Sequence, residues 1–171
     1  MDDLINQLGL NYLDQESGFY TKESISAIEV SAKDGKSPAS NSIYYALTKE
    51  HPQNHLHWLL PDDYHILISG GPADYYIFHP DGTAEMHTLG LDVANEERPM
   101  VVTPGGSRKA VRLRLDSAFV LVGSVVTPAW NPDRVIVGAG PPFIDQFTDK
   151  APWATPEFLK SLIGPNWNPE A

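Results

Sequence analysis

The chain has 171 residues, of which 42% are hydrophobic, and a formal net charge of −10 at pH 7. This length suits one domain that buries a substantial core, and the absence of cysteine excludes disulfides and thiolate metal sites. The negative charge disfavours nucleic acid as a partner, because neutralising phosphates needs clustered lysine and arginine. The first residues lack a basic and an apolar segment, and no run approaches the roughly 18 apolar residues of a membrane span, so we expect a cytoplasmic protein without membrane contact.

Residues 2–9 predict a short helix, because Leu4, Ile5 and Leu8 recur at helical spacing and Gly9 is a typical stop. From there to residue 126 strand patterns dominate. The predicted strands are residues 27–31, 43–48, 55–60, 64–69, 74–79, 84–89, 101–103, 109–115 and 119–126, with a polar loop at 33–40. Many short strands at regular spacing predict an all-β fold, a closed antiparallel β-barrel or a jelly roll.

The composition changes after Pro128, where the chain becomes rich in proline and tryptophan. Within this tail, residues 155–164 predict a short helix with Pro156 at its first position and a glycine at its end. We therefore expect a barrel domain with its N-terminal helix at residues 1–130. The extension at residues 131–171 is expected to pack on the barrel, across its mouth, or on a partner subunit.

A set of residues typical of metal and acid–base sites lies in the middle of the chain. His55-Leu-His57 is followed by Asp63 and His65, and later by Pro104-Gly-Gly106-Ser-Arg-Lys109. On a strand, residues two apart face the same side, so His55 and His57 are expected to share one face, as are Asp63 and His65. The alternation of Lys109 with Val111 and Leu113 favours an inward lysine.

These two segments resemble the two paired motifs of the cupin superfamily. In the first motif His-x-His is followed by a glutamate and a glycine, and in the second Pro-x-Gly is followed by a histidine. Here Asp63 replaces the glutamate after one extra residue, and Lys109 stands at the place of the last histidine. The six-residue gap from Asp63 to Gly70 is kept. The one-residue offset leaves open that Asp62 faces inward instead of Asp63.

A closer resemblance, to the DUF985 (cupin-5) branch of cupins, covers most of the chain before the tail. Short sequence motifs of this branch recur in order at Leu8-Gly9-Leu10, Glu16–Tyr20, Ser42–Leu47, Gly70-Gly71-Pro72, His79–Gly82, Val102–Pro104 and Gly123–Pro128. The resemblance implies a cupin barrel and a homodimer. The branch has no well-defined general function, and its fourth ligand is usually already a glutamine, so a fold is implied more firmly than an activity.

If the resemblance holds, five candidate catalytic side chains converge on the barrel interior: His55, His57, Asp63, His65 and Lys109. Without a metal, Lys109 would pair with Asp63 and polarise a substrate carbonyl, while neutral His57 or His55 removes a proton alpha to it. Schiff-base formation by Lys109 ranks below this, because nothing else in the sequence demands a covalent step. His65 either joins the site or fills space.

The alternative is a divalent ion on His55, His57 and Asp63, since imidazole and carboxylate hold iron, zinc and manganese. A lysine at the fourth ligand position opposes this, because an ammonium repels a divalent cation. We therefore expect no cofactor, with Fe, Zn or Mn as the open alternative.

Three further residues are candidates for substrate binding: Glu16, Tyr20 and Tyr45. The Glu16–Tyr20 segment is either a lid that places Glu16 or Tyr20 on the substrate, or a turn with aromatic packing at the start of a strand. Of the adjacent Tyr44 and Tyr45, one must face inward, and core packing explains both.

The sequence thus predicts a small-molecule enzyme that uses acid–base proton transfer on a carbonyl or polyoxygenated substrate, as an isomerase, epimerase, cyclase or lyase. A metal-dependent dioxygenase or lyase is the first alternative. The second, from a different class, is a non-catalytic cupin that binds a small ligand.

Overall fold

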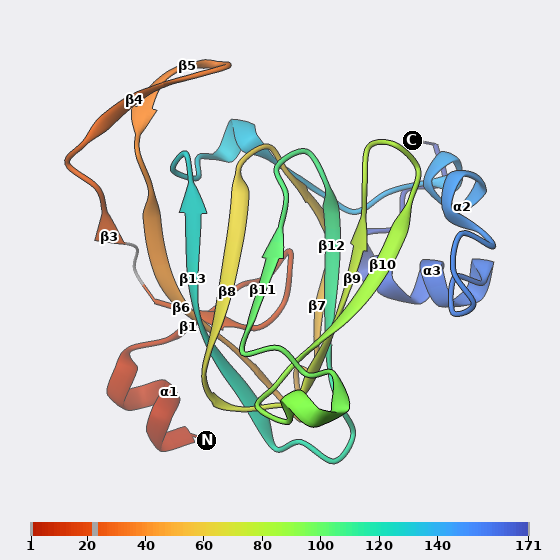
Figure 1. Cartoon of the computed structure of the whole chain (residues 1–171), viewed down its shortest axis with the longest axis horizontal. Coiled ribbons are helices and arrows are strands. Elements are labelled where there is room, and N and C mark those ends of the chain that lie inside the picture. The colour runs from red at the N-terminus through yellow and green to blue at the C-terminus, as the bar shows by residue number, and fades with distance from the viewer. Residues whose placement is uncertain (1, 22–23, 171) are drawn as a thin grey trace.

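The computed structural model describes residues 2–21 and 24–170 and shows two antiparallel β-sheets that face each other (Figure 1). Helix α1 (Asp2–Leu8) ends before Gly9, as the sequence predicts, and its Leu4, Ile5 and Leu8 pack against the first sheet. In the described part of the chain, no helix is both long enough and apolar enough to cross a bilayer.

The first sheet has seven strands in the order β1-β2-β6-β13-β8-β11, with β3 paired to β6. These strands are β1 (Asn11–Tyr12), β2 (Phe19–Tyr20), β3 (Ser24–Ile25), β6 (Asn41–Thr48), β8 (Asp62–Gly70), β11 (Met100–Thr103) and β13 (Phe119–Thr127). The valine-rich β13 lies between β6 and β8, where branched side chains pack well against neighbouring strands.

The second sheet has five strands in the order β10-β9-β12-β7-β14. They are β7 (Gln53–Leu59), β9 (Ala73–Phe78), β10 (Ala84–Leu89), β12 (Arg108–Leu113) and β14 (Val135–Val137). No named strand of one sheet pairs with a strand of the other within the described residues. The expected all-β jelly roll is therefore confirmed, but the closed barrel is wrong, because the two sheets keep separate edges.

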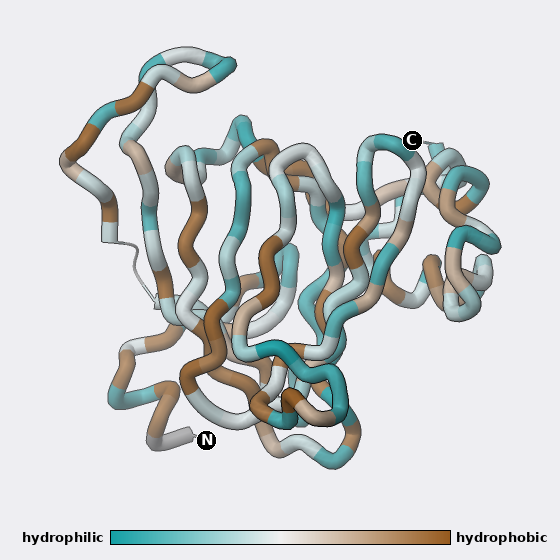
Figure 2. The backbone as a smooth tube through the Cα atoms, viewed as in Figure 1, coloured by the Kyte–Doolittle hydropathy of each residue, from teal (hydrophilic) through white to brown (hydrophobic). Residues whose placement is uncertain are grey.

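The same strands build a packed core at one end of the sandwich and leave a cavity at the other. The core residues are Tyr45, Leu47, Ala73, Tyr75, Ile77, Leu89, Val101, Val111, Leu113, Val120 and Val122. Figure 2 shows hydrophobic residues along the central strands and a hydrophilic loop between β10 and β11, which carries the 3-10 turn η1 (Val93–Asn95). The first residues of β6 and β8 line the cavity, and later residues of the same strands lie in or against this core. The core therefore holds the cavity-lining ends of these two strands in place.

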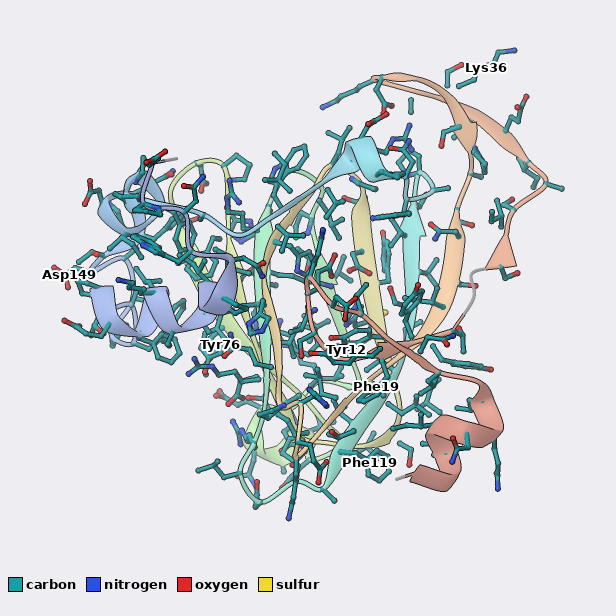
Figure 3. All side chains as sticks on the ribbon, turned by 180° about the vertical axis from the view of Figure 1, so that it is seen from behind. Tyr12, Phe19, Lys36, Tyr76, Phe119 and Asp149 are labelled. Atoms are coloured by element: carbon teal, nitrogen blue, oxygen red, sulfur yellow. The ribbon has the colours of Figure 1, made fainter. Side chains whose placement is uncertain are left out.

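A small hairpin, β4 (Glu29–Ala32) with β5 (Gly35–Pro38), projects away from the sandwich (Figure 1), and Lys36 on β5 is labelled in Figure 3. It replaces much of the predicted polar loop, because Gly35 supplies the positive φ of a tight turn. Buried Arg134, in the 3-10 turn η2 (Pro132–Arg134), donates two 2.6 Å hydrogen bonds to the carboxylate of Asp34 and holds the hairpin to the body.

The C-terminal extension covers the outer face of the five-stranded sheet (Figure 1). After β14 it forms α2 (Pro141–Phe147), α3 (Pro156–Ile163) and the 3-10 turn η3 (Gly164–Asn166). Its buried side chains meet Leu56, Tyr76, Phe78 and Ala110 of the sheet, and Figure 3 shows Tyr76 beside the helices. The extension therefore packs on the back of the sandwich and not across the mouth of the cavity.

Replacing Leu159 by alanine is expected to lower the free energy of unfolding by about 2–5 kcal/mol, because it leaves a cavity beneath α3. Leu159 is fully buried in the cluster between α3 and the sheet. Urea denaturation followed by circular dichroism measures the change. The control, Leu115→Ala, makes the same chemical change at a side chain that is 101% exposed, and should cost no more than about 0.5 kcal/mol. Equal losses in the two variants would contradict this packing.

Candidate active site

A cavity of about 390 Å³ lies between the two sheets. Strands β6, β8 and β13 supply one wall, β7 and β12 the other, and the segment before β2 lies at its edge. The lining residues are Asn11, Leu13, Glu16, Tyr20, Asn41, Ile43, Tyr45, Asn54, His57, Leu59, Asp63, His65, Lys109, Ser124, Val126 and Trp130. Seven of the eight residues that the sequence singles out are therefore brought together, and the eighth, His55, is not.

Lys109 is the central cation of the cavity, with only 2% of its surface exposed. Its ammonium donates a hydrogen bond to Oδ2 of Asp63 and lies 3.0 Å from Nε2 of His65. Asp63 also accepts a hydrogen bond of 3.0 Å from the hydroxyl of Ser124. An ammonium has three N–H donors, so these two contacts leave one N–H for another acceptor.

Asp63, and not Asp62, is the carboxylate that faces the cavity. Asp62 accepts a 2.6 Å hydrogen bond from the backbone N–H of Gly105 in the loop before β12. Asp63 is 3% exposed and lies opposite Thr103 of β11 and Val126 of β13. This resolves the alternative that the sequence leaves open.

The protonation of this cluster follows from its burial and its charges. Burial raises the pKa of Asp63, but His65 and Lys109 outweigh it and hold that pKa well below its usual range. Burial lowers the pKa of His65, and Asp63 only partly opposes this effect. Burial, followed by the charge of Asp63, raises the pKa of Tyr75 well above its ordinary value. Near neutral pH the cluster therefore holds an ionised carboxylate, a neutral imidazole and a neutral phenol.

His65 links the ion pair to the core. Its Nδ1 lies 2.8 Å from the hydroxyl of Tyr75, and its Nε2 faces Lys109. If the ammonium donates to Nε2, the neutral ring carries its proton on Nδ1 and donates it to Tyr75. His65 is thus a connecting member of the network and more than a space-filling side chain.

His57 lies directly opposite Lys109 in the pairing of β7 with β12, so the two side chains share one face of the sheet. Nδ1 of His57 lies 2.8 Å from the carbonyl oxygen of His55, which only accepts hydrogen bonds. In the neutral ring the proton is therefore on Nδ1 and a lone pair is on Nε2. Within the described residues, Nε2 has no hydrogen-bond partner. A carboxylate oxygen of Glu16 lies 3.6 Å from Nδ1.

His55 points away from the cavity, so the expectation that it shares a face with His57 is wrong. Lys109 pairs with His57 and Val111 pairs with Asn54. Between these two pairs β7 therefore has one residue more than β12. This β-bulge reverses the alternation. The ring of His55 instead lies 2.9 Å from the side-chain amide of Gln53 and against Gly164 of the extension.

The segment that carries Glu16 is fixed to the walls of the cavity by its backbone. The carbonyl oxygen of Glu16 accepts hydrogen bonds from the backbone N–H of His55 at 2.7 Å and the side chain of Asn54 at 3.3 Å. The hydroxyl of Tyr45 donates to the carbonyl oxygen of Ser17 at 2.5 Å. Ser17 has a φ of +66°, a conformation that such contacts must hold in place.

Tyr20 and Tyr45 also line the cavity. The hydroxyl of Tyr45 donates to the carbonyl oxygen of Ser17, so its ring is the part that a ligand can contact. The neighbouring Tyr44 is 44% exposed on the outer face of the sheet. Tyr45 is thus the inward member of the tyrosine pair.

Sequence reasoning missed the lining residues Ser124 and Asn54 and the core residue Tyr75, all of which contact the predicted site residues directly. A signal exists for Ser124, because it is a hydroxyl at an inward position of an otherwise apolar strand, in phase with Val122 and Val126. No comparable signal exists for Asn54, whose orientation depends on the bulge.

The donor set does not fit a divalent ion on His55, His57 and Asp63. His55 points outward, and Lys109 occupies the carboxylate oxygen of Asp63 that such an ion would need. Among residues 2–21 and 24–170, no group of three His, Asp or Glu side chains is arranged to hold a metal. The ammonium of Lys109 would repel a dication bound beside it.

Comparisons with known proteins agree with this fold. The Cupin_5 family, described as cupin superfamily (DUF985), matches residues 2–136. An uncharacterized protein of Saccharomyces cerevisiae is 31% identical over 130 residues, which are 74% of this chain and 56% of the yeast protein. The chain thus spans little more than half the length of that relative.

Solved structures show the same architecture. A hypothetical protein of Leishmania major aligns over 94% of this chain and 97% of its own, with a TM-score of 0.80 and 21% identity. A protein of Shewanella oneidensis aligns over 99% of this chain and 98% of its own, with a TM-score of 0.74 and 28% identity. Oxalate decarboxylase of Bacillus subtilis, which has Mn(II) centres, aligns over 74% of this chain and 29% of its own, with a TM-score of 0.54 and 15% identity.

The likeness to the decarboxylase shows the fold alone, because its identity is so low. The family match is of another kind, since it covers most of the chain and includes β7, β8 and β12, which carry the site. The chain belongs to the Cupin_5 (DUF985) family of the cupin superfamily.

Proposed function

We propose that this protein is a small-molecule enzyme that moves a proton on a carbonyl substrate by acid–base catalysis, without a metal. One observation carries the proposal: a buried lysine with one N–H to spare lies opposite a histidine whose Nε2 lone pair is unused by the described residues, inside a cavity of about 390 Å³. A hydrogen-bond donor and a base on one face are the two groups that enolisation requires.

In the proposed reaction, Nε2 of His57 removes a proton from the carbon next to the carbonyl. The electron pair of the broken C–H bond moves to the carbonyl oxygen, which becomes an enolate that accepts the remaining N–H of Lys109. In an alpha-hydroxy carbonyl compound, His57 returns the proton to the former carbonyl carbon while the hydroxyl proton passes to the enolate oxygen, which completes an aldose–ketose type of isomerisation. Loss of a leaving group from the carbon next to the enolate would give an elimination.

The surrounding residues support these two roles. Asp63 and His65 hold the ammonium of Lys109 in one position, so that little reorganisation accompanies the charge that develops on the substrate. The carbonyl of His55 fixes the ring of His57, and the nearby carboxylate of Glu16 stabilises the imidazolium that forms after proton abstraction.

Deuterium exchange alpha to the carbonyl of dihydroxyacetone or cyclohexanone, followed by NMR in D2O, tests the proposal. We expect the wild-type protein to accelerate the exchange. His57→Gln should slow it by about 10²–10⁴-fold and Lys109→Met by about 10²–10³-fold. The matched control is His55→Gln, which removes the neighbouring imidazole that lies outside the cavity and should leave the rate within a few-fold. An unchanged rate in Lys109→Met, or equal losses at the two histidines, would reject these roles.

The metal-free chemistry is a separate part of the proposal, because a related fold holds manganese in oxalate decarboxylase. We expect elemental analysis of untagged protein to find Fe, Zn and Mn far below one ion per chain. Lys109→His should bind Zn²⁺ or Mn²⁺ measurably more tightly, because it replaces the repelling ammonium by an imidazole beside His57 and Asp63. Lys109→Met, which removes the charge without adding a ligand, is the control. Near-stoichiometric metal in the wild type would favour the metal-dependent alternative.

The proposal also requires that His65 stays neutral, and this has a consequence for stability. The pKa of a histidine in an unfolded chain is about 6.5, whereas burial lowers the pKa of His65. Below pH 6.5 the unfolded chain binds this proton before the folded protein does, so the free energy of unfolding falls, by up to about 1.4 kcal/mol per pH unit.

We therefore expect His65→Gln to flatten the pH dependence of stability between about pH 7 and 5. Denaturation midpoints measured across this range give the comparison. His51→Gln, which removes an imidazole from the turn after β6, is the control, and any change that it shares with His65→Gln is not specific to His65. A variant at His65 with an unaltered slope would show that this ring is not buried in its neutral form.

A further inference from the structure

The charges that line the cavity do not balance. Glu16, Asp63 and Lys109 are its charged side chains, and no arginine is among the lining residues. The charge of Lys109 is compensated by Asp63, with which it pairs directly. Glu16 has no lysine or arginine partner within the described part of the chain, and its neighbour is His57. The two carboxylates against the single lysine therefore leave one formal negative charge unmatched among these three side chains.

We infer that this site selects an uncharged carbonyl compound and rejects carboxylates and phosphate esters. The inference rests on the proposed function for the carbonyl and adds the charge class of the substrate. An anion entering the cavity would lose its hydration and meet no unpaired cation, because Lys109 is already paired, while the carboxylate of Glu16 repels it. The net charge of −10 adds a repulsive field outside the cavity.

The other lining residues agree with an uncharged ligand that is polar in part. Three carboxamides, Asn11, Asn41 and Asn54, line the cavity, where they add polar surface without charge. Each already has a partner: Asn41 accepts a hydrogen bond from the backbone N–H of Trp130, and Asn54 and Asn11 donate to backbone carbonyl groups. The aliphatic Leu59 and Val126 and the indole of Trp130 supply apolar wall. A neutral hydroxylated or cyclic ketone or aldehyde matches this mixture of surfaces.

Two pairs of probes that differ by one carboxylate test the inference: cyclohexanone with 4-oxocyclohexanecarboxylate, and D-glucose with D-glucuronate. NMR titration of the wild-type protein, read at the indole N–H of Trp130, gives each dissociation constant. We expect a neutral probe to bind in the millimolar range or better, and its carboxylate partner to bind at least about tenfold more weakly.

Glu16→Gln removes the negative charge with little change of shape, and should reduce the discrimination to less than about threefold. The matched control is Glu157→Gln, which makes the same change of net charge at an exposed site on α3 and should leave the discrimination intact. The wild-type comparison stands on its own if Glu16→Gln does not fold.

Three outcomes would overturn the inference: a carboxylate that binds the wild type as tightly as its neutral partner, no binding by either neutral probe, or equal effects of the two glutamine variants. Failure of the proposed function looks different. Neutral probes that bind without deuterium exchange would reject proton transfer and leave the charge selectivity in place. Deuterium exchange that is faster on the carboxylate probes than on the neutral probes would support proton transfer and reject the charge selectivity.

Discussion

The buried ion pair between Lys109 and Asp63 is the interaction on which the site depends, because it joins the two sheets across the cavity. Asp63 belongs to β8 of the seven-stranded sheet and Lys109 to β12 of the five-stranded sheet. Ser124 of β13 and Tyr75 of β9 extend the network on both sides. A buried charge is tolerated only when it is paired and hydrogen-bonded, and loss of one partner costs about 3–5 kcal/mol. The pair therefore constrains the spacing of the sheets as well as the chemistry between them.

The same pair sets the electrostatics of the site. A fixed ammonium supplies positive charge at the position where the superfamily pattern has a metal-ligating histidine. Unlike an ion, it is already neutralised by Asp63, and it offers one directed N–H in place of several open coordination positions. Polarisation of a neutral oxygen fits such a group better than capture of an anion, so the proposed chemistry and the proposed selectivity have one physical origin.

Local sequence signals predicted the elements well where periodicity and capping act together. Helix α3 begins after Thr155, whose hydroxyl accepts a hydrogen bond from the N–H of Phe158, and ends at Gly164. The long strands lie where alternation places them. Local signals failed for α2 and for the two-residue strands β1, β2 and β3, because so short a segment has no period of its own and forms only against partners distant in the chain.

The sequence by itself determined the family, the jelly-roll strands and seven of the sixteen residues that line the cavity, because motif order and strand alternation are local properties of the chain. Tertiary structure alone decided that His57 faces the cavity while His55 does not, since the bulge in β7 arises from its pairing with β12. It also decided that Glu16 lies beside His57 and that Lys109 is already neutralised by Asp63. These contacts join residues about 40 or more positions apart in the chain, and no local pattern encodes distances of that kind.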